Sequence, residues 1–350
     1  MPKKKFSKIS SIIQDAKKGK MFILVDDKNR ENEGDLVIPA SKCNSKNINF
    51  MAKHGRGLIC LALTKKQVDI LKLPLMSSIN KSRMQTAFTI SIEASRGITT
   101  GISAQDRART IKTAINPKVK KREIVSPGHV FPLVARNGGV LVRAGHTEAS
   151  VDISKLSKLN PSSVICEVMN EDGRMARLND LFKFSKKHNI KLASIEDLIS
   201  YRLKYEKLVS RVSSKSLLIK KIGKLNIYNY KNKLENVNNF VITKGIFNQK
   251  KSIPVRVLSC RIKNKNLLNN IKVKKSLKLI SRYKNFLLLI INNNTSFEEN
   301  SINTLRYYGI GAQIIKDLNV KNMILVSRSK KKIIGLDGFG LKIKKQIIIK

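Results

Sequence analysis

The sequence predicts an α/β protein of two domains, in which strands and helices mix without strict alternation. Its 350 residues suffice for two domains of ordinary size, each with its own core. Short apolar runs of strand length recur throughout the chain, and segments with helical periodicity separate some of them. We therefore expect an α+β domain with a mixed sheet at residues 1–203, and a smaller α/β domain at residues 204–350.

The first part begins with a helix and two strands. Apolar residues recur with helical spacing from residue 9 to residue 18, and Gly19 ends the pattern. Buried strands are expected at residues 21–25 and 36–38, on either side of an acidic segment. Further strands are expected at residues 58–63, 88–92, 138–143, 164–169 and 190–192, with a helix at residues 178–187.

The second part is expected to form a separate α/β unit. Residues 205–250 are polar and rich in Lys and Asn, with short apolar strands such as residues 240–242. More strands are expected at residues 253–258, 286–291 and 323–326, and a helix at residues 308–318.

The charge is strongly positive and unevenly distributed. Basic residues outnumber acidic ones by 70 to 24, a net charge of +46. From residue 201 onward there are 34 basic and 6 acidic residues, which leaves 36 and 18 of these totals for the preceding part. Trp is absent and aromatic residues make up 5%, which gives little support to base stacking on nucleic acid. We expect no nucleic-acid partner, although the basic second part could instead bind a polyanion or a partner protein.

The cysteines and the apolar runs favour a cytoplasmic protein. The four cysteines are scattered and form no CxxC motif, as expected in a reducing compartment. The basic start is not followed by an apolar signal segment. The longest apolar run, residues 286–291, is too short to cross a bilayer, so we expect no membrane partner.

The acidic segment at residues 26–35 reads DDKNRENEGD and carries five carboxylates. A solvated hairpin tip is the ordinary explanation for such a segment. Here Arg30, an anion-binding group, precedes Glu31, and Gly34 permits a tight turn between two apolar strands. Carboxylates on a short rigid turn suit Mg²⁺ or Mn²⁺, which prefer oxygen ligands.

Two histidines and one glutamate add to this signal. Residues 127–132 read PGHVFP and contain His129, while residues 143–148 read RAGHTE and contain His146. Single histidines are more often structural, but both of these lie in Gly-containing segments beside apolar strands. Glu167 interrupts the apolar run at residues 164–169, where a carboxylate is costly unless it is paired or functional. Together these segments predict a metal-assisted site for a small phosphorylated substrate.

These segments, with GITTG at residues 97–101 and the Asp106-Arg107 pair, resemble the 3,4-dihydroxy-2-butanone 4-phosphate synthase family over residues 9–202. The resemblance implies a lyase of riboflavin biosynthesis that converts D-ribulose 5-phosphate to L-3,4-dihydroxy-2-butanone 4-phosphate and formate. It also implies Mg²⁺ or Mn²⁺, with two ions per site, and a homodimer whose sites lie at the subunit interface.

The same resemblance implies roles for individual residues. Glu31 and His146 would ligate the metal, and His129 and Glu167 would be the two residues essential for proton transfer. Contacts with the substrate are implied for Arg30, Glu31, Asp35, Thr100, Arg143, Ala144, Gly145, His146, Thr147 and Glu167.

The second part resembles GTP cyclohydrolase II, most clearly at residues 253–260, 305–315 and 330–340. That family binds zinc through three cysteines, whereas Cys260 is the last cysteine of this chain. Residues 292–297 read NNNTSF where the family has a Gln-Glu-Gly-Arg-Gly loop. Without three thiolates there is no tetrahedral site to activate water, so we expect no zinc and no catalysis in the second part. A bifunctional enzyme that also opens GTP is the alternative.

Overall fold

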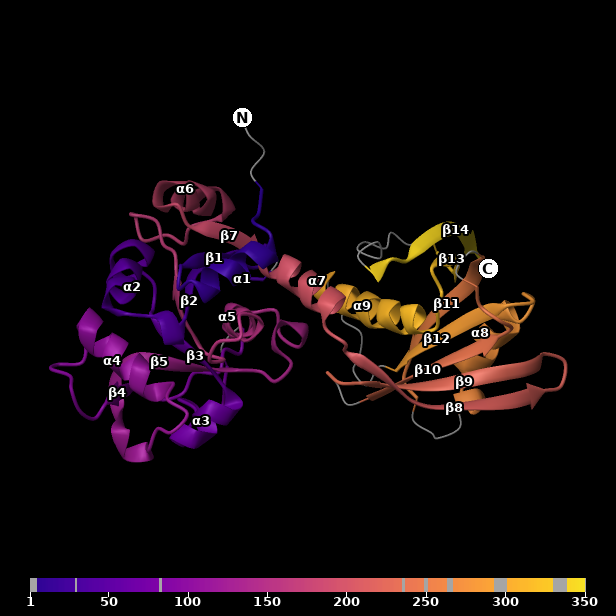
Figure 1. Cartoon of the computed structure of the whole chain (residues 1–350), viewed down its shortest axis with the longest axis horizontal. Coiled ribbons are helices and arrows are strands. Elements are labelled where there is room, and N and C mark those ends of the chain that lie inside the picture. Colours follow the sequence, from indigo (N-terminus) through magenta and orange to yellow (C-terminus); the bar gives the residue numbers. More distant parts are fainter. Residues whose placement is uncertain are drawn as a thin grey trace. The chain divides into compact units, whose positions relative to one another are not determined.

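The computed structural model describes residues 5–28, 30–81, 84–234, 237–248, 251–262, 267–292, 301–329 and 339–349 (Figure 1). The chain divides into two compact units, Met1–Ile199 and Ser200–Lys350. Helix α7 (Ile195–Tyr205) runs across this division. Each unit has a seven-stranded mixed sheet, so the predicted α/β fold class is confirmed.

The sheet of the first unit has the strand order β4-β5-β3-β6-β2-β1-β7. The pairs β1–β7 and β3–β5 are parallel, and the other neighbours are antiparallel. Apolar β-branched and leucine residues fill the inner strands, as expected for strands buried on both faces. The strands are β1 (Phe22–Val25), β2 (Gly34–Pro39), β3 (Cys60–Thr64), β4 (Ile92–Ala94), β5 (Ile124–Ala135), β6 (Ser163–Glu167) and β7 (Lys191–Ser194).

Helices cover both faces of this sheet. Leu36 and Ile38 of β2 point into the main core cluster, together with apolar residues of α2, α3, α4 and α6. Because side chains alternate along a strand, Asp35 and Val37 point to the opposite face. Helix α5 packs against β2, β3, β5 and β6. The helices are α1 (Ile9–Lys17), α2 (Ser45–Phe50), α3 (Lys65–Leu71), α4 (Ala104–Ala114), α5 (His146–Leu156) and α6 (Leu178–His188).

Two predicted strands of the first unit are wrong. Residues 138–143 form a turn with a 3-10 helix at Gly139–Leu141, because Gly138 and Gly139 have φ angles of 92° and 63° that a strand does not use. Residues 88–91 make only isolated bridges, and β4 begins later, at Ile92. The long strand of this region is β5, which includes the PGHVFP segment, so His129 lies in a strand and not in a turn.

The sheet of the second unit has the order β14-β13-β11-β12-β10-β9-β8. Strands β11, β12, β13 and β14 pair in parallel, and β8, β9, β10 and β12 pair antiparallel. Helix α9 (Ser301–Asp317) packs on one face, and α8 (Ile271–Ile280) on the other. The strands are β8 (Val209–Ile219), β9 (Gly223–Asn232), β10 (Val237–Lys244), β11 (Ser252–Cys260), β12 (Phe286–Asn292), β13 (Asn322–Ser327) and β14 (Lys342–Ile348).

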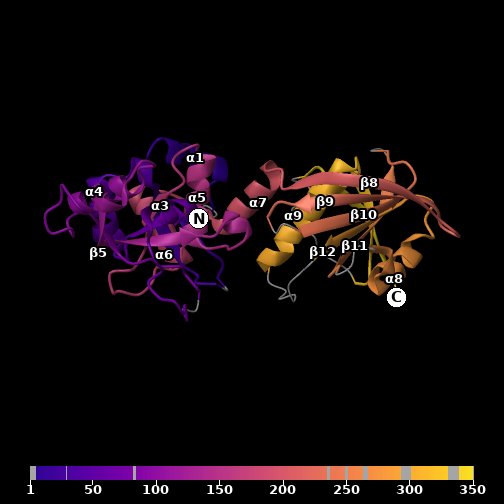
Figure 2. The same cartoon turned by 90° about the horizontal axis from the view of Figure 1, so that it is seen from below.

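The polar stretch at residues 205–250 forms longer strands than predicted. Strands β8, β9 and β10 run side by side in both views (Figures 1 and 2). Strand β8 borders only β9, and most of its side chains are exposed, which explains its polar sequence. Residues 330–338, in a segment that resembles GTP cyclohydrolase II, lie outside the described residues, as do residues 293–297 of the segment that departs from that family. No helix in the described part of the chain is both long and apolar enough to cross a membrane.

Candidate active site

The acidic loop between β1 and β2 is organised by Asp26. Its buried carboxylate accepts hydrogen bonds from the Glu31 backbone N–H at 3.0 Å, the Glu33 backbone N–H at 2.9 Å and Arg30 Nη1 at 2.9 Å. Arg177 Nη1 also donates to the backbone oxygen of Glu31, at 2.8 Å. The loop is therefore held in one conformation by its own side chains and by one arginine from another part of the chain.

Glu31 and His146 lie together beside Asp35. Nδ1 of His146 is 3.5 Å from Oε2 of Glu31 and 3.8 Å from Oδ1 of Asp35. His146 is the first residue of α5 and is buried, with Gly145 as the N-cap. One ligand atom each from Asp26, Glu31 and His146 lie within 4.8 Å of one another. The two residues predicted as metal ligands are thus neighbours, and their role as ligands stays a prediction.

The charges of this cluster are strongly coupled. Burial opposes ionisation of Glu31, but the hydrogen bond with His146 and the positive charge of Arg30 outweigh it and lower the pKa of Glu31 to about 2. Burial raises the pKa of Asp35, and the charges of Glu167 and Glu31 raise it further, against the opposing charge of His146. Burial disfavours the charged form of His146, but Asp35 and Glu31 raise its pKa above the ordinary value. Glu31 is therefore ionised near neutral pH, and the pKa values of the adjacent Asp35 and His146 are both displaced upward.

Two arginines approach the start of α5. A Cβ atom at Gly145 would lie 2.5 Å from Nη1 of Arg143 and 3.0 Å from Nη2 of Arg30, so both guanidinium groups flank this glycine. Arg143 is held by Glu148 at 2.7 Å and by the hydroxyl of Thr86 at 3.0 Å. Two arginines at a helix N-terminus favour an anion. This turn contains the five consecutive residues predicted to contact the substrate: Arg143, Ala144, Gly145, His146 and Thr147. Their contact with the substrate stays a prediction.

Glu167 belongs to the same cluster. It ends β6 and is the cross-strand partner of Asp35 on β2. Its Oε2 accepts a hydrogen bond from the Leu58 backbone N–H at 2.8 Å. A Cβ at Gly57 would lie 2.5 Å from the same oxygen, so Gly57 leaves the space that this carboxylate fills. Gly57 and Leu58 were not among the predicted site residues.

His129 lies on β5, two strands away from Glu167 on β6. Cys60 on β3 pairs with Phe131 on one side and with Ile165 on the other, so His129 and Glu167 lie at the same level, two strands apart. Strands in a sheet are about 4.8 Å apart, which separates these two positions by roughly 10 Å. Nδ1 of His129 contacts Oε1 of Glu93.

Thr100 is an exposed residue of the loop that precedes α4. The base of this loop is fixed by Asp106, which accepts hydrogen bonds from Thr99 Oγ1 at 2.7 Å and from the Gly101 backbone N–H at 3.1 Å. The loop therefore presents Thr100 to solvent on a fixed base.

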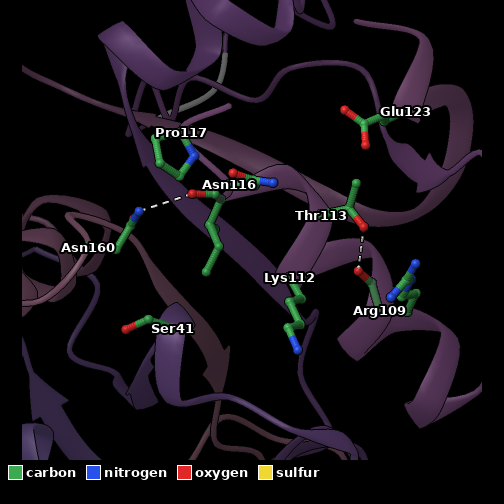
Figure 3. Close-up of a pocket in the computed structure, with 9 residues that line it drawn as sticks. Ser41, Arg109, Lys112, Thr113, Asn116, Pro117, Glu123 and Asn160 are labelled. Atoms are coloured by element: carbon green, nitrogen blue, oxygen red, sulfur yellow. Dashed lines mark hydrogen bonds between the residues drawn. The ribbon is translucent and has the colours of Figure 1, made fainter. Parts of the chain in front are cut away.

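A pocket of about 480 Å³ is lined by Ser41, Asn160 and residues of α4 and the segment that follows it (Figure 3). Ser41 follows β2 and Asn160 precedes β6, whereas Asp35 and Glu167 lie at the opposite ends of the same two strands. Asn160 donates to the Ile115 backbone oxygen at 3.0 Å. The pocket is thus separate from the Glu31 cluster. Its lining residues are Ser41, Arg109, Lys112, Thr113, Ile115, Asn116, Pro117, Glu123 and Asn160.

Comparison with known proteins assigns the first unit. Residues 10–201, more than half of the chain, match the 3,4-dihydroxy-2-butanone 4-phosphate synthase family. The chain belongs to this family. Residues 291–348 match the GTP cyclohydrolase II family. The predicted family and enzyme class, and a place in riboflavin biosynthesis, are confirmed.

Relatives of the family cover the whole chain. The riboflavin biosynthesis protein RibBA of Aquifex aeolicus is 44% identical over 99% of this chain and 93% of its own length. The crystal structure of RibBX, a two-domain 3,4-dihydroxy-2-butanone 4-phosphate synthase from A. baumannii, is 36% identical with a TM-score of 0.80, covering 98% of this chain and 99% of that one. A synthase crystallised with two magnesium ions is 38% identical with a TM-score of 0.55, covering 57% of this chain and 99% of that one.

Proposed function

We propose that residues 1–203 convert D-ribulose 5-phosphate to L-3,4-dihydroxy-2-butanone 4-phosphate and formate, with Mg²⁺ or Mn²⁺. The observation that carries this proposal is the pair of half-buried Glu31 and buried His146, with Arg30 and Glu167 in the same cluster, in a chain of the synthase family. A related synthase that binds two magnesium ions supports the metal requirement.

The side chains present fit a divalent cation. Glu31 is ionised, and Nε2 of His146 is buried without a hydrogen-bond partner among the described residues. Asp26 already accepts three hydrogen bonds, so we assign it to shaping the loop, and assign Glu31 and His146 as ligands. We propose two ions per site; a related synthase structure holds two magnesium ions. When bound, the metal supplies a Lewis acid for the carbonyl and hydroxyl oxygens of the substrate.

Basic residues at the N-terminus of α5 bind the substrate. Arg30 and the turn from Arg143 to Thr147 attract and orient the anionic substrate at the N-terminus of α5. Asp35, buried beside His146, accepts hydrogen bonds from substrate hydroxyl groups. Thr100, exposed on its loop, contacts the phosphate.

Proton transfer falls to His129 and Glu167. Formation of an enediol requires a base, and the later dehydration and rearrangement require groups that both give and take protons. One oxygen of Glu167 is held by the Leu58 backbone N–H, which leaves the other for proton exchange. His129 is partly exposed and supplies the second exchanging group.

We propose that the enzyme is a homodimer with sites at the subunit interface. Support comes from His129 and Thr100, which are accessible residues outside the Glu31 cluster of their own chain. Mixing inactive Glu31→Gln and His129→Ala subunits tests this. If the two residues meet across the interface, the mixed dimer regains one intact site. No regained activity would place both residues in one chain.

We propose that the second domain, predicted at residues 204–350, neither binds zinc nor opens GTP. Cys260 is the only cysteine beyond residue 200, and none of the four histidines lies there. Elemental analysis showing one zinc per chain, or formate released from GTP, would restore the bifunctional alternative.

We also propose a cytoplasmic location, supported by the four free thiols and a role in biosynthesis.

The decisive experiment uses the purified full chain with ribulose 5-phosphate and Mg²⁺. Formate and the butanone phosphate should appear in equal amounts. Absence of both products in the presence of metal would contradict the proposed reaction.

A further inference from the structure

His129 and Glu93 form a carboxylate–imidazole pair between β5 and β4. Nδ1 of the histidine contacts Oε1 of the glutamate. The side chain of Glu93 is only 16% exposed, whereas that of His129 is 44% exposed. The histidine therefore commits one ring nitrogen to a largely buried carboxylate and presents the rest of its ring outward.

The position of Glu93 is built by three separate segments. The pairing of β4 with β5 is irregular at this point, because Ile92 pairs with Val130 while Glu93 pairs with Val125. A Cβ at Gly128 would lie 2.5 Å from Cγ of Glu93, and a Cβ at Gly101 would overlap its carboxylate. Two glycines from different segments thus leave the space in which the Glu93 side chain lies.

The loop that contains Gly101 is itself fixed. Gly101 has a φ of 86°, in the region that favours glycine, and its backbone N–H donates to Asp106 at 3.1 Å. On the other side, the Gly128 backbone N–H donates to Ser91 Oγ at 3.1 Å. The carboxylate of Glu93 is therefore confined between two constrained backbone segments, with its oxygen directed at His129.

We propose that Glu93 is a positioning residue for His129 in the synthase reaction. A carboxylate at Nδ1 accepts the Nδ1–H hydrogen bond, fixes this tautomer and leaves Nε2 free for proton exchange. When Nε2 takes a proton from the substrate, Glu93 stabilises the imidazolium until the proton is returned in a later step, so no proton is gained or lost. The inference rests on the proposed role of His129 in proton transfer.

Activity measurements on the full chain with Mg²⁺ test this role. Glu93→Gln keeps the size of the side chain and should fold in the same space, while Glu93→Ala removes it. We expect both to lower kcat by about 10²-fold or more, with KM within about threefold of wild type, as for loss of a group that orients a general base. Near-normal kcat in Glu93→Ala would overturn the inference.

A double variant separates positioning from a merely structural role. If Glu93 acts through His129, then Glu93→Ala in the His129→Ala background should change kcat by less than about twofold. A further loss as large as in the single variant would mean that Glu93 supports the fold and not the histidine. Glu123→Gln is the matched control, because Glu123 lies near the same strands and binds the Lys120 backbone N–H instead. It should leave kcat unchanged.

A spectroscopic readout does not depend on activity. Nitrogen-15 spectra of labelled histidine report which ring nitrogen carries the proton, and four histidines permit assignment by single substitutions. We expect the Nδ1–H form of His129 in the wild type and a mixture in Glu93→Gln. The Nε2–H form in the wild type would overturn the inference. The expected spectra together with full activity of His129→Ala would overturn the proposed role of His129, and with it the role of Glu93 in the reaction, while leaving the pairing of the two side chains in place.

Discussion

The two units share an architecture and differ in where their interacting carboxylates lie and how these are paired. Each has a seven-stranded mixed sheet with helices on both faces. In the first unit, carboxylates crowd together, and the charges of Glu167 and Glu31 help to raise the pKa of Asp35. In the second unit, the exposed carboxylate of Asp317 is paired with the exposed guanidinium of Arg211 at 2.7 Å and accepts a hydrogen bond from the hydroxyl of Tyr230 at 2.6 Å.

This difference separates a reactive site from a stabilising network. Buried like charges weaken a fold and are retained where their perturbed ionisation is useful. A balanced pair with a satisfied hydroxyl contributes to stability and has no group left over for a substrate. An α/β fold with a helix on each face can therefore persist after, or without, a ligand set.

Removal of the metal should cause the largest loss of synthase activity. EDTA should abolish turnover of ribulose 5-phosphate, and Mg²⁺ or Mn²⁺ should restore it, because Glu31 and His146 are the proposed ligands. Glu31→Gln and His146→Ala should likewise lose nearly all activity while circular dichroism shows an intact fold. Full activity after exhaustive chelation would remove the metal from the mechanism.

Loss of a proton-transfer group should cause the next largest loss of activity. Glu167→Gln and His129→Ala should each lower kcat by about 10²- to 10⁴-fold with little change in substrate affinity. Steady-state kinetics and direct binding measurements distinguish these effects. A variant whose affinity falls while kcat stays normal would have only a binding role.

Displacing Glu167 through a neighbouring residue should lower kcat less than replacing Glu167 itself. In Gly57→Ala, the new Cβ would lie 2.5 Å from Oε2 of Glu167 and 2.6 Å from its backbone oxygen, so both the carboxylate and the end of β6 must shift away from the Leu58 N–H. A misplacement of this size can lower kcat by about 10²-fold. Gly173→Ala is the control for backbone strain alone, since Gly173 has a positive φ of 81° and nothing within 4 Å of a Cβ, whereas Gly57 lies outside the left-handed region. Equal losses in both variants would show that only backbone strain matters.

The affinity for metal should depend on pH. His146 has a raised pKa of about 9, so near neutral pH a bound proton must leave before the imidazole can ligate a cation. Raising the pH toward this value should therefore increase the affinity for Mg²⁺, by at most about tenfold per pH unit for one displaced proton. Calorimetry in two buffers of different ionisation enthalpy measures the proton release. No release would mean that His146 is not a ligand.

The smallest effect on turnover should come from the second unit. Tyr230→Phe removes the hydroxyl that donates to Asp317 and should lower the free energy of unfolding of this unit by about 1–2 kcal/mol. We expect kcat for ribulose 5-phosphate to stay unchanged, as thermal unfolding and activity assays can show together. A fall in kcat without unfolding would give the second unit a part in the reaction.

The sequence predicts buried strands well and exposed or irregular ones poorly. Strands such as β1 and β12 carry continuous apolar runs that only burial explains. Strand β8 is mostly exposed and has no such run, and β5 contains the Pro and Gly residues that usually mark a turn. Helix α5 is hidden in the sequence because its buried face includes polar residues.

The candidate site divides along the same line. Glu31 and His146 belong to short motifs that can be read from neighbouring residues. The contact of Leu58 with Glu167 joins residues 109 positions apart, and that of Glu93 with His129 joins residues 36 positions apart. Such contacts depend on strand register, which a single sequence without a clear alternating pattern does not specify.

The large sequence separation of the two proposed metal ligands makes the stability of the fold depend on the concentration of free cation. Glu31 belongs to a short loop, whereas His146 begins a helix much later in the chain, so an unfolded chain cannot offer both to one ion. A cation that binds only the folded form stabilises it by mass action, by about 1.4 kcal/mol when free cation is tenfold above its Kd. In a cell with too little of this cation, the protein would thus lose its activity and would also unfold and be degraded more often.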